Sequence, residues 1–305
     1  MRVIQRACPA GERVIALGTF DGVHRGHQSL LRSAKGLARE LGVPLRVCTF
    51  NRHPLEVLRP DDPPDLLSTI PEKARRLLLS GADEMELLPF DRETAGMEPE
   101  SFLEMLRNNT GVRALVAGWN YSFGRMGRGN AELLQADGAK NGYRVLIEPP
   151  VTLPDGTAVS SSLIRQKLKE GKPESAAELL GYPYTLAGSV ATGKQEGRRL
   201  GYPTANIEPW KRKALPRYGV YTALLETETD LYAAVVNIGV QPTLPSGRVT
   251  VEAHVLGDNP ELYGQKVRLT LRSMLREEKR FRSPEELRRQ IERDRLKALR
   301  AFGMA

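Results

Sequence analysis

The chain has 305 residues, with 45 lysines and arginines against 37 aspartates and glutamates, so its formal net charge is +8. Its hydrophobic fraction of 40% and charged fraction of 27% are typical of soluble globular proteins and exclude a disordered chain. No apolar run reaches membrane-spanning length, and Arg6, Glu12 and Arg13 interrupt the apolar start, so we expect a cytoplasmic protein with no signal peptide and no membrane partner.

The cysteines and the basic charge narrow the possible ligands. Cys8 and Cys48 are the only cysteines, and neither lies in a CxxC pattern, which argues against a disulfide framework and a thiolate zinc site. The basic residues are scattered, with no like-charged block beyond short runs such as KRK at 211–213. A basic excess suits nucleic acid or polyanionic small molecules such as nucleotides, and charge alone leaves both open.

The first half of the chain alternates apolar, β-type runs with segments of helical spacing. Strands are expected at residues 13–19, 44–50, 84–90, 113–118 and 143–149. Helices are expected at 27–41, 71–81, 99–109 and near 130–140, followed by two short helices at 159–171 and 172–181. This alternation predicts a Rossmann-like parallel sheet covered on both faces, in a domain of residues 1–182.

The second half of the chain has a different sequence pattern. Short strand-like runs separated by Gly/Pro turns occur at 185–192, 199–207, 219–226, 231–238, 248–256 and 265–275. Closely spaced strands without helices between them predict a small antiparallel β-barrel, in a domain of residues 183–305. A closing helix is expected after Ser283, with Pro284 first, Glu286 completing a capping box and an apolar stripe of Leu287, Ile291, Leu296 and Leu299.

The stretch GTFDGVHRGH, residues 18–27, follows the first expected strand of the α/β half. Ligands of open parallel sheets bind at the carboxyl ends of the strands, where helix N-termini point. Its glycines, Gly18, Gly22 and Gly26, favour tight turns and close approach of a ligand to the backbone. His24 and His27 are three residues apart and would share one side of a helical first turn, which suits a triphosphate.

Two other interpretations of the histidine pair remain open at this point. His24 and His27 could form half of a zinc site, with a distant third ligand such as His53 and a carboxylate. They could also do no more than cap the helix.

Two motifs in the second half bear on phosphate and metal. GSVATGKQ, residues 188–195, nearly matches the P-loop motif GxxxxGK(S/T). The match fails because Gln195 stands where the motif has a magnesium-binding hydroxyl, and because no helix is expected to follow. In PTAN, residues 203–206, Thr204 and Asn206 alternate, so in an extended segment their oxygens point to one side and suit Mg²⁺. Taken alone, PTAN fits a turn or strand end equally well.

A family resemblance joins these motifs. GTFDGVHRGH resembles the HxGH signature of the nucleotidyltransferase superfamily, and with its FDG it resembles the bacterial bifunctional riboflavin kinase/FAD synthetase family. Further matching stretches follow in order: TFNRHP (49–54), GWNYSFGRMGRG (118–129), VSSSLIRQKLKEG (159–171), GRRLGYPTANI (197–207), VEAHVL (251–256), ELYGQ (261–265) and LREEKRF (275–281). These stretches cover nearly the whole chain and contain all four histidines.

For the α/β half, the resemblance implies a nucleotidyltransferase-like domain that transfers AMP from ATP to FMN, giving FAD and pyrophosphate. His24 and His27 would hold the ATP phosphates as catalytic residues, and Asn120 would lie at the flavin, beside the aromatic Tyr121 and Phe123. The implied ATP-binding residues of this half are Gly18, Phe20, Gly22, Gly26, Ser161, Ser162 and Arg165. The family's SST appears here as SSS, which keeps the hydroxyl.

For the barrel half, the resemblance implies riboflavin phosphorylation to FMN. PTAN would be the kinase signature, with Thr204 and Asn206 binding Mg²⁺, and Glu252 would be the general base. Other residues carried over are Gly193 and Lys194 near ATP, and Arg276 and Phe281 at the flavin. The implied partners are therefore riboflavin, FMN and ATP, without nucleic acid. The alternatives are a transferase active in one half only and a nucleic-acid-binding protein.

Overall fold

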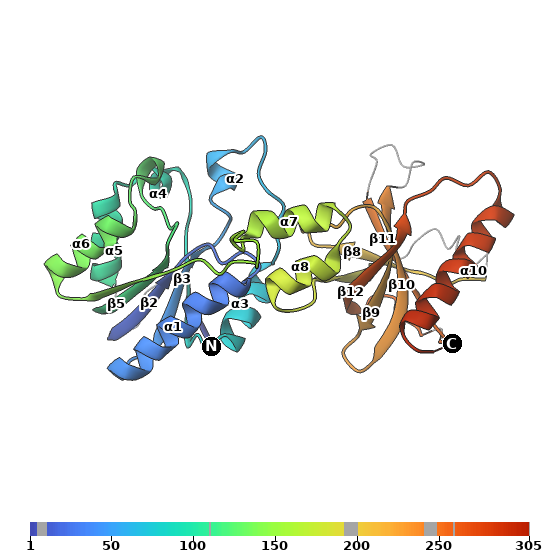
Figure 1. Ribbon diagram of the computed structural model, residues 1–305, viewed down its shortest axis with the longest axis horizontal. Coiled ribbons are helices and arrows are strands. Elements are labelled where there is room, and N and C mark those ends of the chain that lie inside the picture. The colour runs from blue at the N-terminus through green and yellow to red at the C-terminus, as the bar shows by residue number, and fades with distance from the viewer. Residues whose placement is uncertain (5–10, 110, 192–200, 241–248, 259, 305) are drawn as a thin grey trace. The chain divides into compact units, whose positions relative to one another are not determined.

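The computed structural model describes residues 1–4, 11–109, 111–191, 201–240, 249–258 and 260–304. Contacts between residues divide the chain into two compact units, Met1–Ser161 and Ser162–Ala305. Figure 1 shows the helices and strands of both units. Within the described residues, none of the helices combines the length and the apolar character needed to cross a membrane.

The first unit is built on a six-stranded parallel sheet, as the alternating sequence pattern predicts. Its strands lie in the order β1-β4-β3-β2-β5-β6. Their bounds are β1 Arg2–Ile4, β2 Glu12–Leu17, β3 Leu45–Phe50, β4 Glu84–Leu88, β5 Gly111–Gly118 and β6 Arg144–Glu148. The edge strand β1 was not predicted, because three residues are too short to show a periodic pattern.

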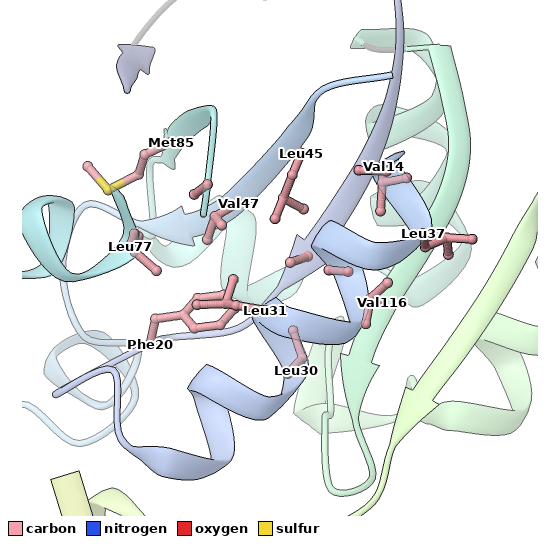
Figure 2. Close-up of a cluster of buried hydrophobic side chains, with 14 of the residues drawn as sticks. Val14, Phe20, Leu30, Leu31, Leu37, Leu45, Val47, Leu77, Met85 and Val116 are labelled. Carbon is pink, nitrogen blue, oxygen red and sulfur yellow. The ribbon is translucent and has the colours of Figure 1, made fainter. Parts of the chain in front are cut away.

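Helices cover both faces of this sheet, and each face has its own apolar cluster. Helices α1 (Arg25–Leu41) and α3 (Ile70–Leu79) contribute to one cluster, and α5 (Pro99–Asn109) and α6 (Ala131–Asn141) to the other. Figure 2 shows the first cluster, with the ring of Phe20 pointing in beside Leu31. Short helices α2 (Leu55–Leu58) and α4 (Arg92–Gly96) lie in connections. The sheet's carboxyl edge is thus fixed by packing on both sides.

The second unit begins with helices α7 (Ser161–Lys169, whose first residue falls in the first unit) and α8 (Pro173–Leu180), and continues into a closed barrel. The barrel order is β10-β11-β8-β7-β12-β9, with antiparallel pairing between neighbours. The strand bounds are β7 Thr185–Ala191, β8 Ala205–Pro209, β9 Gly219–Glu226, β10 Leu231–Val240, β11 Val249–Val255 and β12 Lys266–Glu277. The predicted antiparallel barrel is confirmed.

The closing helix α10 (Pro284–Ala301) begins as predicted but buries a different stripe. Ser283 accepts from the Glu286 backbone N–H, whereas the Glu286 carboxylate accepts from the backbone N–H of Arg282 instead of completing a capping box. The buried residues of the helix are Gln290, Asp294 and Ala298, while Leu296 of the predicted apolar stripe is exposed. The buried carboxylate of Asp294 accepts a hydrogen bond from Arg276 of β12, which explains why the buried stripe is polar.

Candidate active sites

The turn between β2 and α1 has a strained backbone, and packing in the hydrophobic core holds it in place. Phe20 and Val23, which are not glycines, have φ values of 49° and 37°, and Gly22 has 78°. The Phe20 side chain is fully buried, which anchors its unfavourable backbone in the apolar cluster. A Cβ on Gly18 would lie 3.0 Å from the Phe20 ring, so a side chain at this position would crowd the ring.

The carboxylate of Asp21 clamps this turn to the segment that leads into α3. Asp21 accepts hydrogen bonds from the backbone N–H groups of Leu67 and Ser68, both at 3.0 Å, and from the Ser68 hydroxyl at 3.2 Å. The Ser68 hydroxyl in turn accepts from the backbone N–H of Gly22 at 3.0 Å. The turn is therefore positioned by a segment far away in the sequence.

The two histidines lie together at the start of α1, as their spacing predicts. His24 is the N-cap residue, and its Nδ1 accepts from the backbone N–H of His27 at 3.4 Å. Their rings stack, with centroids 3.7 Å apart and planes 19° from parallel. Because Nδ1 of His24 is an acceptor, the neutral ring carries its proton on Nε2. His24 thus caps the helix and keeps one N–H for another acceptor.

Burial keeps both imidazoles uncharged at neutral pH. It lowers the pKa of His24 to about 4, against a smaller opposing effect of Asp21. The pKa of His27 is lowered well below its usual value by burial first, then by His24 and by Lys73. Nδ1 of His27 is buried without a hydrogen-bond partner among the described residues. The pair can therefore act through hydrogen bonds at a helix N-terminus, where the helix dipole adds positive potential.

Of the remaining residues predicted for this site, one is bonded to the turn and the others lie on other segments of the chain. The hydroxyl of Ser161 donates to the Asp21 carbonyl at 2.9 Å, which ties it to the turn. Ser162 and Arg165 follow on α7 in the second unit. Asn120 is exposed just after β5, the strand that neighbours β2 in the sheet.

The aromatic pair beside Asn120 is part of the core. Tyr121 and Phe123 stack at 5.7 Å between centroids, and both pack into the second apolar cluster. His53 accepts at Nδ1 from the backbone N–H of Leu55. No group of three or more His, Cys, Asp or Glu side chains within the described ranges could hold a metal ion, so the described residues give a zinc site no support.

Sequence reasoning missed a buried lysine at this edge. Lys73, on α3, is 9% exposed and donates to the Thr19 carbonyl at 2.7 Å and to the Thr49 hydroxyl at 3.4 Å. Burial lowers its pKa to about 8, against a smaller raising effect of Asp21. Lys73 lies four residues before the buried Leu77, so a lysine at a core-facing helix position was the available signal.

In the barrel, strand register brings Glu252 between two asparagines. Glu252 on β11 pairs with Asn206 on β8 on one side and with Asn237 on β10 on the other. Residues directly opposite in antiparallel strands share one face, with Cβ atoms about 4.5–5.5 Å apart. All three are half-buried, whereas the neighbouring Val251 and Ala253 are buried inside the barrel. The three polar side chains therefore form a row on the outer face of the barrel.

Thr204 and Asn206 occupy alternate positions as predicted. Ala205 between them is buried, while Thr204 and Asn206 are half-buried. Nδ1 of His254 lies 2.9 Å from the Pro203 carbonyl, and that oxygen can only accept, so the ring donates. Thr204 also lines a small pocket of about 70 Å³ at the barrel. Gly193 and Lys194 lie outside the described residues.

Comparison with known proteins identifies a family for each half of the chain. A family model for FAD synthetase matches residues 8–163, and one for riboflavin kinase matches residues 180–302. The bifunctional riboflavin kinase/FMN adenylyltransferase of Escherichia coli strain K12 is 35% identical over 95% of this chain and 93% of its own length. The Bacillus subtilis strain 168 enzyme of the same name is 34% identical over 95% and 92%.

This chain belongs to the bifunctional riboflavin kinase/FMN adenylyltransferase family. A crystal structure of a macrolide-efflux protein from Streptococcus pneumoniae has the same fold along its length, with a TM-score of 0.87 and 30% identity. That match covers 96% of this chain and 97% of the other. Enzymes of the riboflavin kinase and FAD synthetase families are transferases that use ATP, typically with a divalent metal.

Within the riboflavin kinase half, Arg276 lies beside Phe281 and is also bound by α10. The Arg276 guanidinium lies 5.7 Å from the Phe281 ring centroid. Its Nε donates to the buried Asp294 carboxylate at 2.9 Å, and Gln290 donates to the other oxygen of that carboxylate. This buried acceptor accounts for the polar stripe of α10. Val220 links Arg276 in register to Asn237, so the row of Glu252 continues toward Arg276.

Proposed function

We propose that this chain converts riboflavin to FMN in its barrel half and FMN to FAD in its α/β half, consuming one ATP in each step. The observation that carries the proposal is the presence of both family models in order on one chain, with 35% identity to a bifunctional relative over 95% of its length. We place the boundary at residues 182/183, so that α7 and α8 belong with the adenylyltransferase. The proposed partners are the small molecules riboflavin, FMN and ATP, and the anionic FMN and ATP suit the chain's basic excess.

In adenylyl transfer, a phosphate oxygen of FMN attacks the α-phosphorus of ATP. The new P–O bond forms as the bond to the β-phosphate oxygen breaks, and pyrophosphate leaves. The N–H at Nε2 of His24 and the ring of His27, at the N-terminus of α1, donate to the phosphates while charge builds on them. No side chain needs to form a covalent intermediate, because positioning and charge stabilisation suffice.

Other residues of this half supply the surroundings of ATP and flavin. The main chain of Gly18, Phe20, Gly22 and Gly26 lines the phosphates, since the Phe20 side chain is in the core. Ser161, Ser162 and Arg165 at the start of α7 bind further phosphate oxygens. Asn120 contacts the flavin, and its exposure after β5 leaves its amide accessible.

In the kinase half, Glu252 takes the proton of the riboflavin 5′-hydroxyl, whose oxygen then attacks the γ-phosphorus of ATP and releases ADP. The hydroxyl of Thr204 and the carboxamide of Asn206 fit Mg²⁺, because both are neutral oxygen donors on one side of the strand. When bound, Mg²⁺ neutralises charge on the ATP phosphates. Gly193 and Lys194 bind ATP in this half, and Arg276 with Phe281 borders the flavin.

Product chromatography tests the proposal. Purified protein given ATP, Mg²⁺ and riboflavin should yield FMN and then FAD. His24→Ala should stop the sequence at FMN, while Glu252→Ala should block FMN formation and still convert supplied FMN to FAD. Survival of both activities in both variants would refute the residue assignments, and absence of both products from the parent protein would refute the function.

A further inference from the structure

Lys73 is the one buried ammonium group at the carboxyl edge of the described sheet that the adenylyl-transfer scheme leaves without a role. Its Nζ reaches the Thr19 carbonyl at 2.7 Å and the Thr49 hydroxyl at 3.4 Å. The Thr49 hydroxyl donates to the same Thr19 carbonyl at 3.0 Å. Three elements therefore meet at one carbonyl oxygen: the end of β2, the end of β3 and α3.

That carbonyl lies directly before the strained turn. Phe20, the next residue, has a φ of 49°, a conformation that persists only when the surroundings impose it. Asp21 follows, clamped to Leu67 and Ser68 just before α3. The segment from Leu67 to Lys73 thus holds the turn at both its start and its middle.

Lys73 also acts electrostatically on the histidine pair. Its charge is among the causes that lower the pKa of His27, and the negative charge of Asp21 raises the pKa of Lys73 itself. The titratable groups of the described residues that act on His27 are His24 at the N-cap and Lys73 on α3, while Asp21 acts on both of those. A cation on α3 is therefore coupled to an imidazole on α1.

We propose that Lys73 is a positioning residue for adenylyl transfer: its ammonium group fixes the Thr19 carbonyl, and so the turn that presents His24 and His27, and its charge acts on the His27 ring. The inference rests on the proposed adenylyltransferase function of the α/β half. It assigns to α3 a role that the HxGH motif by itself does not contain.

Lys73→Met in the full-length chain tests this role, because methionine keeps an apolar stem and removes the donor and the charge. The rate of FAD formation from FMN should fall by about tenfold to a hundredfold, as expected when catalytic groups are misplaced by about 1 Å. The rate of FMN formation should not change. In histidine NMR titrations of the ligand-free protein, the midpoint of His27 should move upward in Lys73→Met, which loses the charge, and stay at the parental value in Lys73→Arg, which keeps it. A purely structural loss of burial would instead move the midpoint in both variants.

Lys35→Met is the matched control, since Lys35 is a half-buried lysine of α1 whose ammonium group pairs with Asp83, in the connection between α3 and β4. It should change neither the FAD rate nor the His27 midpoint. If Lys73→Met does not fold, Lys73→Arg replaces it: retained charge should keep the His27 midpoint at the parental value while altered geometry lowers the FAD rate.

An unchanged His27 midpoint in Lys73→Met, or a parental rate of FAD formation, would overturn the proposal. If the parent protein forms no FAD but Lys73→Met still shifts the His27 midpoint, the coupling between Lys73 and His27 stands. The adenylyltransferase function is then refuted instead. The titration needs no substrate, so the two failures are distinguishable.

Discussion

The two candidate sites present their reactive side chains by different physical means. In the α/β half, His24 and His27 project from a turn with unfavourable φ values that is held by Asp21 and Lys73. In the barrel half, Asn206, Glu252 and Asn237 take their places from strand register alone. The first arrangement depends on individual polar contacts from α3 and the segment just before it, and the second on the spacing of neighbouring backbones. Single substitutions should therefore damage them in different ways.

The largest expected effect concerns the clamp of the first site. Asp21→Ala leaves the backbone N–H groups of Leu67 and Ser68 without their buried acceptor and removes the charge that opposes Lys73. We expect the α/β unit to lose about 3–5 kcal/mol of stability. Hydrogen–deuterium exchange with mass spectrometry measures the two units separately. Exchange should quicken in residues 12–50 and stay unchanged in the barrel strands.

Asp91→Ala is the control for this substitution, because Asp91 caps the short helix α4 on the surface. It should disturb exchange only around α4. If residues 12–50 exchange at the same rate in Asp21→Ala as in Asp91→Ala, the turn does not depend on the Asp21 clamp. The two sites would then not differ in how their side chains are held.

The next effect is a pH dependence confined to the first unit. Burial lowers the pKa of His24 from 6.5 to about 4, so the unfolded chain binds this proton at a higher pH than the folded chain does. Stability is therefore full above about pH 6.5 and falls by roughly 3 kcal/mol as the pH drops to about 4. His24→Asn keeps an N-cap acceptor that does not titrate, so hydrogen exchange of this unit should show a flatter pH profile. An identical profile in parent and variant would contradict the buried, neutral His24.

Much of this contrast follows from sequence patterns, and some of it could not. The β-α alternation, the short barrel strands and the position of the histidine pair follow from local periodicity and glycine placement. The pairing of Glu252 with both Asn206 and Asn237 requires strand register, which no local pattern fixes. The stripe on α10 was mispredicted because a buried Asp294 satisfies Arg276 of β12, a contact between distant segments. Lys73 was missed for the same reason, since its acceptors lie just after β2 and on β3.

A smaller effect is expected in the second site when the spacing between β7 and β8 is increased. A Cβ on Gly188 of β7 would lie 2.2 Å from the carbonyl oxygen of Glu208 on β8, the strand that carries Asn206. Gly188→Ala must therefore push β8 away, at a cost of about 1–3 kcal/mol. Riboflavin phosphorylation should slow while FMN adenylylation is unchanged, as chromatography of both products would show. Ser189→Ala, at an exposed position of the same strand, should leave both rates unaltered.

The smallest effect separates ring placement from helix stability on α1. A Cβ on Gly26 would lie 3.2 Å from the His24 ring, closer than most real contacts, whereas a Cβ on Gly36 of the same helix would meet no atom within 4 Å. Gly36→Ala should stabilise the unit by about 0.5–1 kcal/mol and leave both rates unchanged. Gly26→Ala, in the first turn of the same helix, should slow FAD formation about tenfold, because the displaced ring no longer stacks on His27. Assaying FAD formation and thermal unfolding of both variants together decides the point: if Gly26→Ala forms FAD at the parental rate, the stacked geometry of the pair is not what adenylyl transfer requires.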